Sequence, residues 1–179
     1  DLTFSAPKSV SVLIALYGEN RLLEAWNRAV SETLKEVESL VSSRVMKEGE
    51  TETQLTQKAV IATFNHDTSR NLDPQLHTHA LFLNMTPTES GWRTLASGTV
   101  RKDGFIEAVY ANQLALGQIQ LNLLRRQVEA MGYETVDTGK NGLWEIKGVP
   151  VDIFSTRSQQ IREAVGDDAS AKSRSVAAL

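Results

Sequence analysis

Residues 66–79 read HDTSRNLDPQLHTH, and this stretch holds all three histidines of the chain. Short apolar runs precede it at residues 58–64 and follow it at residues 77–83, which predicts a strand on each side. Asn71 to Pro74 are turn-forming residues between the two runs. We therefore expect an antiparallel hairpin with a long loop.

This hairpin predicts where the histidines lie. Side chains alternate across a strand, so His77 and His79 share a face. His66 ends the first strand and His77 starts the second, so antiparallel pairing brings them together. Three convergent imidazoles suit a divalent transition metal and leave positions open for water or substrate, as in catalytic sites. The alternative is that they are ordinary packed or surface residues, and the pattern does not name the metal.

The composition favours a folded domain. At 179 residues and 41% hydrophobic, the chain can bury a core and is expected to form one domain. Its net charge of −3 does not favour nucleic-acid binding, although residues 55–102 carry five Lys or Arg against three Asp or Glu. No apolar run approaches the ~18 residues of a membrane span, so no membrane insertion is expected. Without cysteine, disulfides and thiolate metal sites are excluded.

The rest of the pattern predicts a mixture of helices and strands. Further strands are expected over residues 2–5, 43–47, 92–95, 133–136 and 143–146, the last two as a hairpin. Helices are expected over 7–17 with Ser5 as the N-cap, 19–42, 107–131 ended by Gly132, and 151–165. Turns are expected at 48–53, 86–91 and 101–104, and a polar tail or linker at 167–179.

Three residues are candidate DNA contacts, each with a plain alternative. Lys8 lies in the first turn of an expected helix, and a lysine at a helix N-terminus attracts phosphate. Arg70 lies in the hairpin loop, and Gln113 on an amide-rich helix, where amides can read base edges. The alternatives are a solvated loop and an ordinary helix surface. Asp67 or Asp73, also in the loop, could orient a ligand imidazole.

The chain resembles conjugative relaxases of the TraI/TrwC type, the MobF group. HDTSR at 66–70 with DPQLHTH at 73–79 is similar to the three-histidine motif of that family, and DLTFSAPKSVS at 1–11 is similar to another block. Further similarity lies at 109–113, 132–135, 148–150 and 162–166. The resemblance spans essentially the whole chain and is strongest to the F-type plasmid TraI branch.

The resemblance implies a fold and an activity. The fold is of the α+β class, a palm-like antiparallel β-sheet flanked by helices (the HUH relaxase fold). The activity is that of a metal-dependent, site- and strand-specific DNA relaxase, which nicks and rejoins one strand at a plasmid origin of transfer during conjugation. A tyrosine hydroxyl attacks the phosphodiester and leaves a 5′-phosphotyrosine and a free 3′-hydroxyl. The cofactor is one divalent metal ion, Mg or Mn, with Zn, Ni or Co accepted in vitro.

Residue roles carry over from the motifs. His66, His77 and His79 are the implied metal ligands, and Asp1 matches an aspartate that supports the site beside a histidine and helps to activate the nucleophile. The nucleophilic tyrosine of the family lies upstream of the block at residue 1, and the tyrosines of this chain do not match its motif: Tyr17, Tyr110 and Tyr133.

We therefore expect residues 1–166 to be a relaxase domain whose N-terminal elements are missing. The implied partner is single-stranded DNA at the origin of transfer, with relaxosome accessory proteins and a conjugative secretion apparatus. The implied setting is the bacterial cytoplasm, for a plasmid-encoded monomer that is transferred with the DNA. The alternatives are an inactive single-stranded DNA-binding fragment and, less favoured, a metal hydrolase that uses metal-bound water.

Overall fold

The structure, a computed structural model, describes residues 1–98, 103–139, 142–154, 159–160, 163 and 166. Three α-helices are described: α1 (Lys8–Tyr17), α2 (Asn20–Ser39) and α3 (Phe105–Ala130), with a 3-10 helix at Asp152–Phe154. The strands are β1 (Leu2–Ser5), β2 (Ser42–Lys47), β3 (Glu50–Leu55), β4 (Ile61–Thr68), β5 (Pro74–Phe82), β6 (Thr86–Thr88), β7 (Gly91–Arg93), β8 (Thr135–Asp137) and β9 (Trp144–Ile146). Their pairings are antiparallel.

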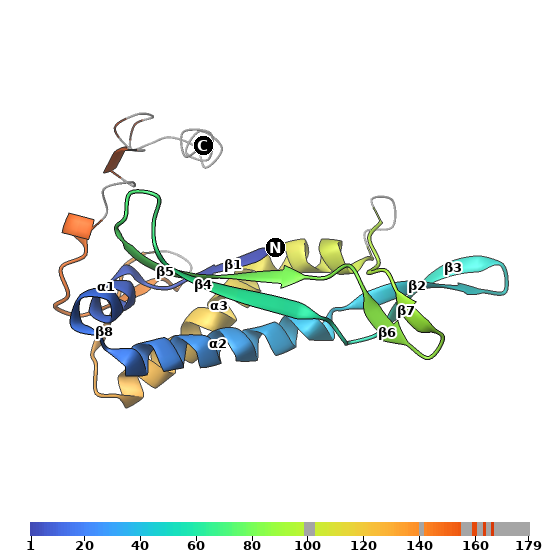
Figure 1. The fold of residues 1–179 in the computed structure, drawn as a ribbon, viewed down its shortest axis with the longest axis horizontal. Helices are drawn as coiled ribbons and strands as arrows, with labels where there is room; N and C mark the ends of the chain where they lie inside the picture. The colour runs from blue at the N-terminus through green and yellow to red at the C-terminus, as the bar shows by residue number, and fades with distance from the viewer. Residues whose placement is uncertain (99–102, 140–141, 155–158, 161–162, 164–165, 167–179) are drawn as a thin grey trace.

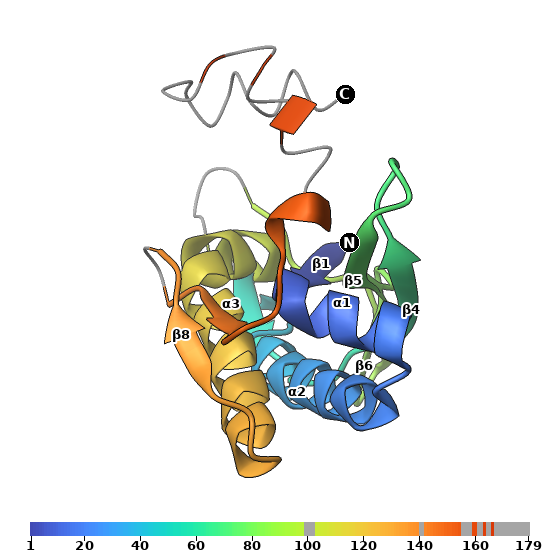
Figure 2. The same ribbon diagram turned by 90° about the vertical axis from the view of Figure 1, so that its left-hand side faces the viewer.

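The central sheet has three strands in the order β1-β5-β4, so β5 is the middle strand. The helices lie on one side of this sheet, and the β2–β3 hairpin projects from one end of the molecule (Figure 1). Viewed from the end, the sheet and α3 lie on opposite sides, with α1 and α2 between them (Figure 2). This arrangement confirms the expected α+β class with an antiparallel sheet flanked by helices.

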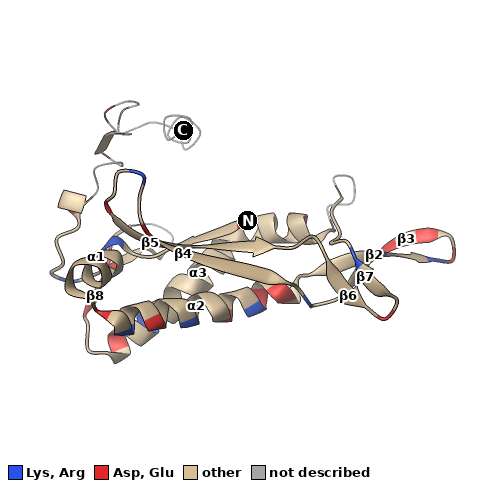
Figure 3. Cartoon of the chain, in the orientation of Figure 1, with Lys and Arg blue, Asp and Glu red and all other residues tan. Residues whose placement is uncertain are grey.

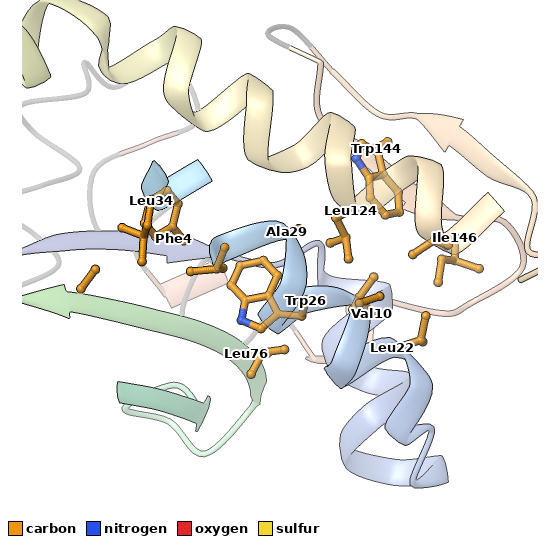
Figure 4. Packing of buried hydrophobic residues seen from close by; sticks show 14 residues of the cluster. Phe4, Val10, Leu22, Trp26, Ala29, Leu34, Leu76, Leu124, Trp144 and Ile146 are labelled. Atoms are coloured by element: carbon orange, nitrogen blue, oxygen red, sulfur yellow. The ribbon is translucent and has the colours of Figure 1, made fainter. Parts of the chain in front are cut away.

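The core lies between the sheet and the helices. Trp26 of α2 is fully buried and packs with Phe4 of β1, Leu76 of β5 and Leu124 of α3 (Figure 4). Trp144 of β9 is also buried in this cluster. Because large apolar side chains contribute most of the hydrophobic free energy of folding, this cluster fixes the sheet against the helical layer. Among the described helices, none is long and apolar enough to span a bilayer.

The hairpin of β4 and β5 forms as expected, but its loop is short. β4 continues to Thr68 and β5 begins at Pro74, so only residues 69–73 connect them. The Ser69 hydroxyl accepts hydrogen bonds from the amides of Asn71 and Asp73, both at 3.2 Å. Leu72 takes a positive φ of 60° inside this turn. The side chain of Ser69 thus stabilises a tighter turn than the loop composition predicts.

Two predicted boundaries are wrong around the β2–β3 hairpin. The expected helix over 19–42 stops at Ser39, because Ser42 already pairs with Leu55 in the hairpin. The expected turn over 48–53 is reduced to Glu48 and Gly49, both with positive φ, and the polar residues after it form β3. Strand pairing satisfies the backbone groups of this polar segment, which its side chains do not reveal.

Of the remaining predicted elements, some are confirmed, and others lie partly outside the described residues. The hairpin of β8 and β9 is confirmed, and the predicted turn at 86–91 contains a small hairpin of β6 and β7. Of the helix predicted over 151–165, the structure gives the 3-10 helix Asp152–Phe154, and much of the remainder lies outside the described residues. Of the predicted turn at 101–104, the first two residues lie outside the described residues, and Gly104 is the N-cap of α3. The predicted tail at 167–179 lies wholly outside them.

Candidate metal centre

The three histidines converge as the hairpin predicts. His66 is the cross-strand partner of His77, and His79 lies two residues further along the same face of β5. Their ring centroids are 5.1 to 5.2 Å apart, and one ring nitrogen from each lies within 4.8 Å of the other two. A β-bulge between His66 and Thr68 ends the regular pairing directly after the site. Bulges near sheet ends re-aim side chains, so this one contributes to the local geometry.

Hydrogen bonds orient two of the imidazoles. The Nδ1–H of His79 donates to Oδ2 of Asp1 at 2.8 Å, and the Thr3 hydroxyl lies 3.2 Å from the same nitrogen. The Nδ1–H of His77 donates to the backbone carbonyl of Gln75 at 2.9 Å. Since a carboxylate and a carbonyl can only accept, the proton lies on Nδ1 in both rings. In the neutral form of each ring, Nε2 then carries the lone pair that a metal ion needs.

This chemistry fits a small divalent cation. Three neutral imidazoles form a nitrogen donor set, and a carboxylate behind one of them raises the basicity of that ligand. Sequence reasoning found all three histidines, and the family resemblance supplied Asp1. It missed Thr3 and the Gln75 carbonyl. Thr3 could have been found from β1 pairing beside β5, because Thr3 is the cross-strand partner of His79.

The histidines line a shallow hollow on the exposed face of the sheet. Its volume is about 450 Å³, and its other lining residues are Thr68, Ser69, Arg70 and Gln75. Arg70 thus lies beside the candidate metal centre, as a phosphate contact requires. Acidic segments (red in Figure 3) are concentrated on α2 and the β2–β3 hairpin, whereas the β4–β5 hairpin carries both signs of charge around its loop. Arg70 there is flanked in sequence by Asp67 and Asp73.

Lys8 has a different environment from the one expected. Its ammonium donates to the Pro74 carbonyl at 2.9 Å, and burial lowers its pKa against the opposing charges of Asp73 and Glu145. The amides of Lys8 and Ser9 donate to the Glu145 carboxylate at 3.1 and 2.7 Å. Glu145 thus takes the place of the predicted Ser5 cap at the start of α1, and Ser5 lies in β1. A carboxylate already occupies the anion-binding position of this helix. As a DNA contact, Lys8 stays a prediction.

Gln113 lines a second, larger hollow of about 740 Å³ between β1 and α3. Asp1 and Thr3 also line it, so this groove reaches the metal centre from the side of β1. Its walls are largely apolar and include Phe82, Ile106, Tyr110 and Leu114. Gln113 thus lines the same hollow as Asp1 and Thr3, and its contact with DNA stays a prediction. Asp1 supplies the carboxylate beside His79, and a role for Asp67 or Asp73 beside the histidines stays a prediction.

Comparison with known proteins agrees with the site. The profile of the TrwC relaxase family matches residues 1–179. The multifunctional conjugation protein TraI of Escherichia coli (strain K12) is 59% identical over 179 residues, which are 100% of this chain and 10% of TraI. The chain therefore spans about a tenth of the length of this relative.

Solved structures of the conjugative relaxase TrwC have the same fold. A complex with mutant oriT DNA superposes with a TM-score of 0.89 at 33% identity, covering 100% of this chain and 64% of that one. A metal-bound complex with oriT DNA gives 0.87 at 32% identity, covering 99% and 61%. Family and fold thus coincide with a three-histidine centre on an exposed sheet face.

Proposed function

This chain belongs to the TrwC relaxase family, and we propose that it is part of a metal-dependent relaxase that nicks and rejoins one DNA strand at a plasmid origin of transfer during conjugation. The observation that carries the proposal is the solvent-open cluster of His66, His77 and His79, with Arg70 in the same hollow. TrwC, which shares the fold, is described in complex with oriT DNA and with metal.

The proposed cofactor is one divalent ion, Mg or Mn, held by His66, His77 and His79. When bound, it would supply positive charge that binds a phosphate and stabilises the charge developing on its oxygens. Asp1 has the task of holding the Nδ1 proton of His79, which keeps the Nε2 lone pair of that ring available. The carbonyl of Gln75 does the same for His77. One carboxylate and one backbone carbonyl thus orient His79 and His77 before a metal ion arrives.

The proposed reaction is a transesterification. A tyrosine hydroxyl would attack the phosphorus, the bond to the 3′-oxygen would break, and the products would be a 5′-phosphotyrosine and a free 3′-hydroxyl. Within the described part of the chain, no tyrosine lines the hollow of the histidines. Tyr133, for example, donates its hydroxyl to Glu19 at 3.0 Å. On the family resemblance, we propose that the nucleophile is a tyrosine outside this sequence, because Tyr17, Tyr110 and Tyr133 do not match the nucleophile motif of the family.

The proposed DNA-binding surface is the exposed face of the sheet. Arg70 would bind phosphate, Gln113 would contact the strand in the groove beside β1, and Lys8 is the weakest candidate because its ammonium already contacts a carbonyl. Phe64 pairs with His79 on β4 and is 50% exposed. An exposed aromatic ring suits the stacking of an unpaired base. Single-stranded DNA is therefore the favoured ligand.

The decisive experiment uses the full-length protein and an oligonucleotide of its own origin strand, with added Mn²⁺ or Mg²⁺. We expect the shortened oligonucleotide and a covalent protein–DNA adduct on a denaturing gel, both abolished by a chelator. Cleavage without an adduct would instead indicate hydrolysis by metal-bound water. If the oligonucleotide is not cleaved and no adduct forms, the proposal is wrong.

A second candidate follows from the lack of a tyrosine among the described residues of the hollow. This chain by itself would then be a single-stranded DNA-binding fragment that does not cut. Arg70→Ala should weaken its DNA binding by a similar factor on all sequences and reduce the salt dependence by about one ion. DNA binding that His77→Ala leaves unchanged, without cleavage in any form of the protein, would favour this candidate.

The wider setting is proposed on the family alone. The protein would act as a monomer in the bacterial cytoplasm, with relaxosome accessory proteins and a conjugative secretion apparatus as partners. Residues 1–166 would form the relaxase unit and residues 167–179 a tail or linker. Size-exclusion chromatography with light scattering tests the monomer, and limited proteolysis tests the boundary.

A further inference from the structure

A network of hydrogen bonds runs behind the histidines, on the side of the same strands that is turned toward α2, and it extends from the buried Trp26 to the exposed Asn65. The indole N–H of Trp26 donates to the Thr78 hydroxyl at 2.8 Å, and this hydroxyl donates to Oδ1 of Asn65 at 2.6 Å. The amide of Asn65 then donates to Oδ1 of Asn27 at 2.7 Å. An indole N–H can only donate, so the Thr78 hydroxyl accepts from Trp26 and keeps its own proton to donate to Asn65. These hydrogen bonds therefore join α2 to both strands of the β4–β5 hairpin.

The middle of this hydrogen-bond network lies directly behind the metal centre. Asn65 and Thr78 are cross-strand partners, and their neighbours His66 and His77 form the next pair. Thr78 is 2% exposed and lies between His77 and His79 in the sequence. A hydrogen bond between the two side chains ties β4 to β5 directly beneath the imidazoles. It lies immediately before the β-bulge that follows His66.

We propose that Thr78, with Asn65, is a positioning residue that fixes the register of β4 against β5 and thereby the approach of His66 to the other two histidines. The inference rests on the proposed function, since it assumes that these histidines bind a divalent ion. A shift of one residue in a strand moves every side chain to the other face, and a bulge is a place where the register changes. A buried hydroxyl that must satisfy the Trp26 indole opposes such a shift.

The competing explanation is that the hydroxyl of Thr78 only satisfies buried polar groups and so contributes to stability alone. Thr33 provides a matched control. It is fully buried on α2, and its hydroxyl donates to the Ala29 carbonyl at 2.8 Å. Replacing either threonine by valine removes a buried hydroxyl with little change in volume. The two variants should therefore differ in their effect on the metal centre.

The experiment compares Thr78→Val, Thr33→Val and Thr78→Ser by thermal unfolding and by Mn²⁺ affinity, measured from the free ion by electron paramagnetic resonance. We expect Thr78→Val to lower the affinity by about 10-fold or more, the range for groups that orient metal ligands. Thr78→Ser keeps the hydroxyl and should restore the affinity. Thr33→Val should lower the melting temperature and leave the affinity unchanged.

Two further measurements keep the test decisive. Asn65→Ala breaks the middle of the chain at an exposed position, so its effect on the affinity does not depend on repacking the core. The histidine ring signals in NMR spectra of the metal-free protein should shift in Thr78→Val and Asn65→Ala but not in Thr33→Val. If neither the ring signals nor the affinity distinguish these variants from the control, the inference is wrong. If the wild type binds no Mn²⁺, the proposed function fails, and the ring signals still decide the positioning role.

Discussion

The two faces of the β1-β5-β4 sheet are made by the same strands and have opposite properties. On β5, Leu76, Thr78 and Ala80 are 3%, 2% and 0% exposed and face the helices. Between them, His77 and His79 point to the other face, where they remain partly accessible. One face therefore carries the packing of the domain and the other carries the candidate chemistry.

The difference teaches how a short strand can serve both purposes. Because the side-chain period of a strand is two, residues one position apart belong to different environments although their backbones are joined. Substitutions on the inner face should then change stability, and substitutions on the outer face should change metal or DNA binding. Thr78 would be the exception, since it lies on the inner face and acts on the outer one.

The largest effect on binding is expected from His77→Ala. Removal of a group that only orients a metal ligand weakens binding by about 10–100-fold. Loss of one of the three ligands themselves should weaken Mn²⁺ binding by more than this. The melting temperature of the metal-free protein should stay close to that of the wild type, because the ring is on the outer face. Titration calorimetry and thermal unfolding measure the two quantities.

Gln75→Ala is the matched control for His77→Ala. It lies on the same face of the same strand, and it retains the backbone carbonyl that holds the Nδ1 proton of His77. Mn²⁺ affinity should be unchanged in this variant. An equal loss of affinity in both variants would show that the face, and not the imidazole, is responsible.

Leu76→Ala, one residue away from His77, is expected to lower the stability of the fold and to leave the Mn²⁺ affinity nearly unchanged. Leu76 is buried in the main cluster, and truncation of a buried leucine typically costs about 2–5 kcal/mol. Urea unfolding should show this loss, while the Mn²⁺ affinity of the folded protein stays within a few-fold of the wild type. If the fully folded Leu76→Ala variant showed a large loss of Mn²⁺ affinity, the two faces of the sheet would not be independent.

A smaller effect on the metal centre is expected from Asp1→Ala. The variant removes the acceptor of the His79 Nδ1 proton, so the ring can rotate or change its tautomer. Mn²⁺ affinity should fall by about 10–100-fold, less than in His77→Ala. Asp1→Asn should lie between this variant and the wild type, because an amide oxygen can still accept the hydrogen bond. Affinity in Asp1→Ala equal to the wild type would leave Asp1 without a role in metal binding.

The same contrast explains what the sequence predicts and what it does not. Convergence of the histidines depends only on strand period and hairpin pairing, and both are local, so the prediction is confirmed. The ends of elements depend on distant partners. Ser42, the last residue of the predicted long helix, belongs to β2 and pairs with Leu55. At the start of α1, Glu145 takes the place of the predicted Ser5 cap, although it lies 136 positions from the Ser9 amide that it accepts from.

The hydrogen bonds around the imidazoles show the same limit. Asp1 is distant from His79 in sequence, and only the family resemblance brought it into the site. The Gln75 carbonyl is a backbone group, which no residue pattern identifies. Thr78 reads as an ordinary strand threonine, and its importance follows from Trp26, which lies on another element. The local sequence pattern therefore predicts the three histidines of the metal centre, whereas the groups that orient them become apparent only from contacts between elements.

The smallest effect is expected from Glu19→Gln, at the start of α2 and remote from the metal centre. Hydrogen bonds from Arg21 and then Tyr133 lower the pKa of Glu19 to about 2, against about 4.3 in an unfolded chain. A lowered carboxyl pKa stabilises the folded state above about pH 4.3, and this contribution is lost as the pH falls towards about 2. The difference in melting temperature between wild type and variant should therefore be small, as for exposed ion pairs generally, and should disappear over that pH range. Mn²⁺ affinity at pH 7 should not change, because Glu19 is not among the residues that line the hollow of the histidines. A pH-independent difference would mean that the side chain acts through packing and not through its charge.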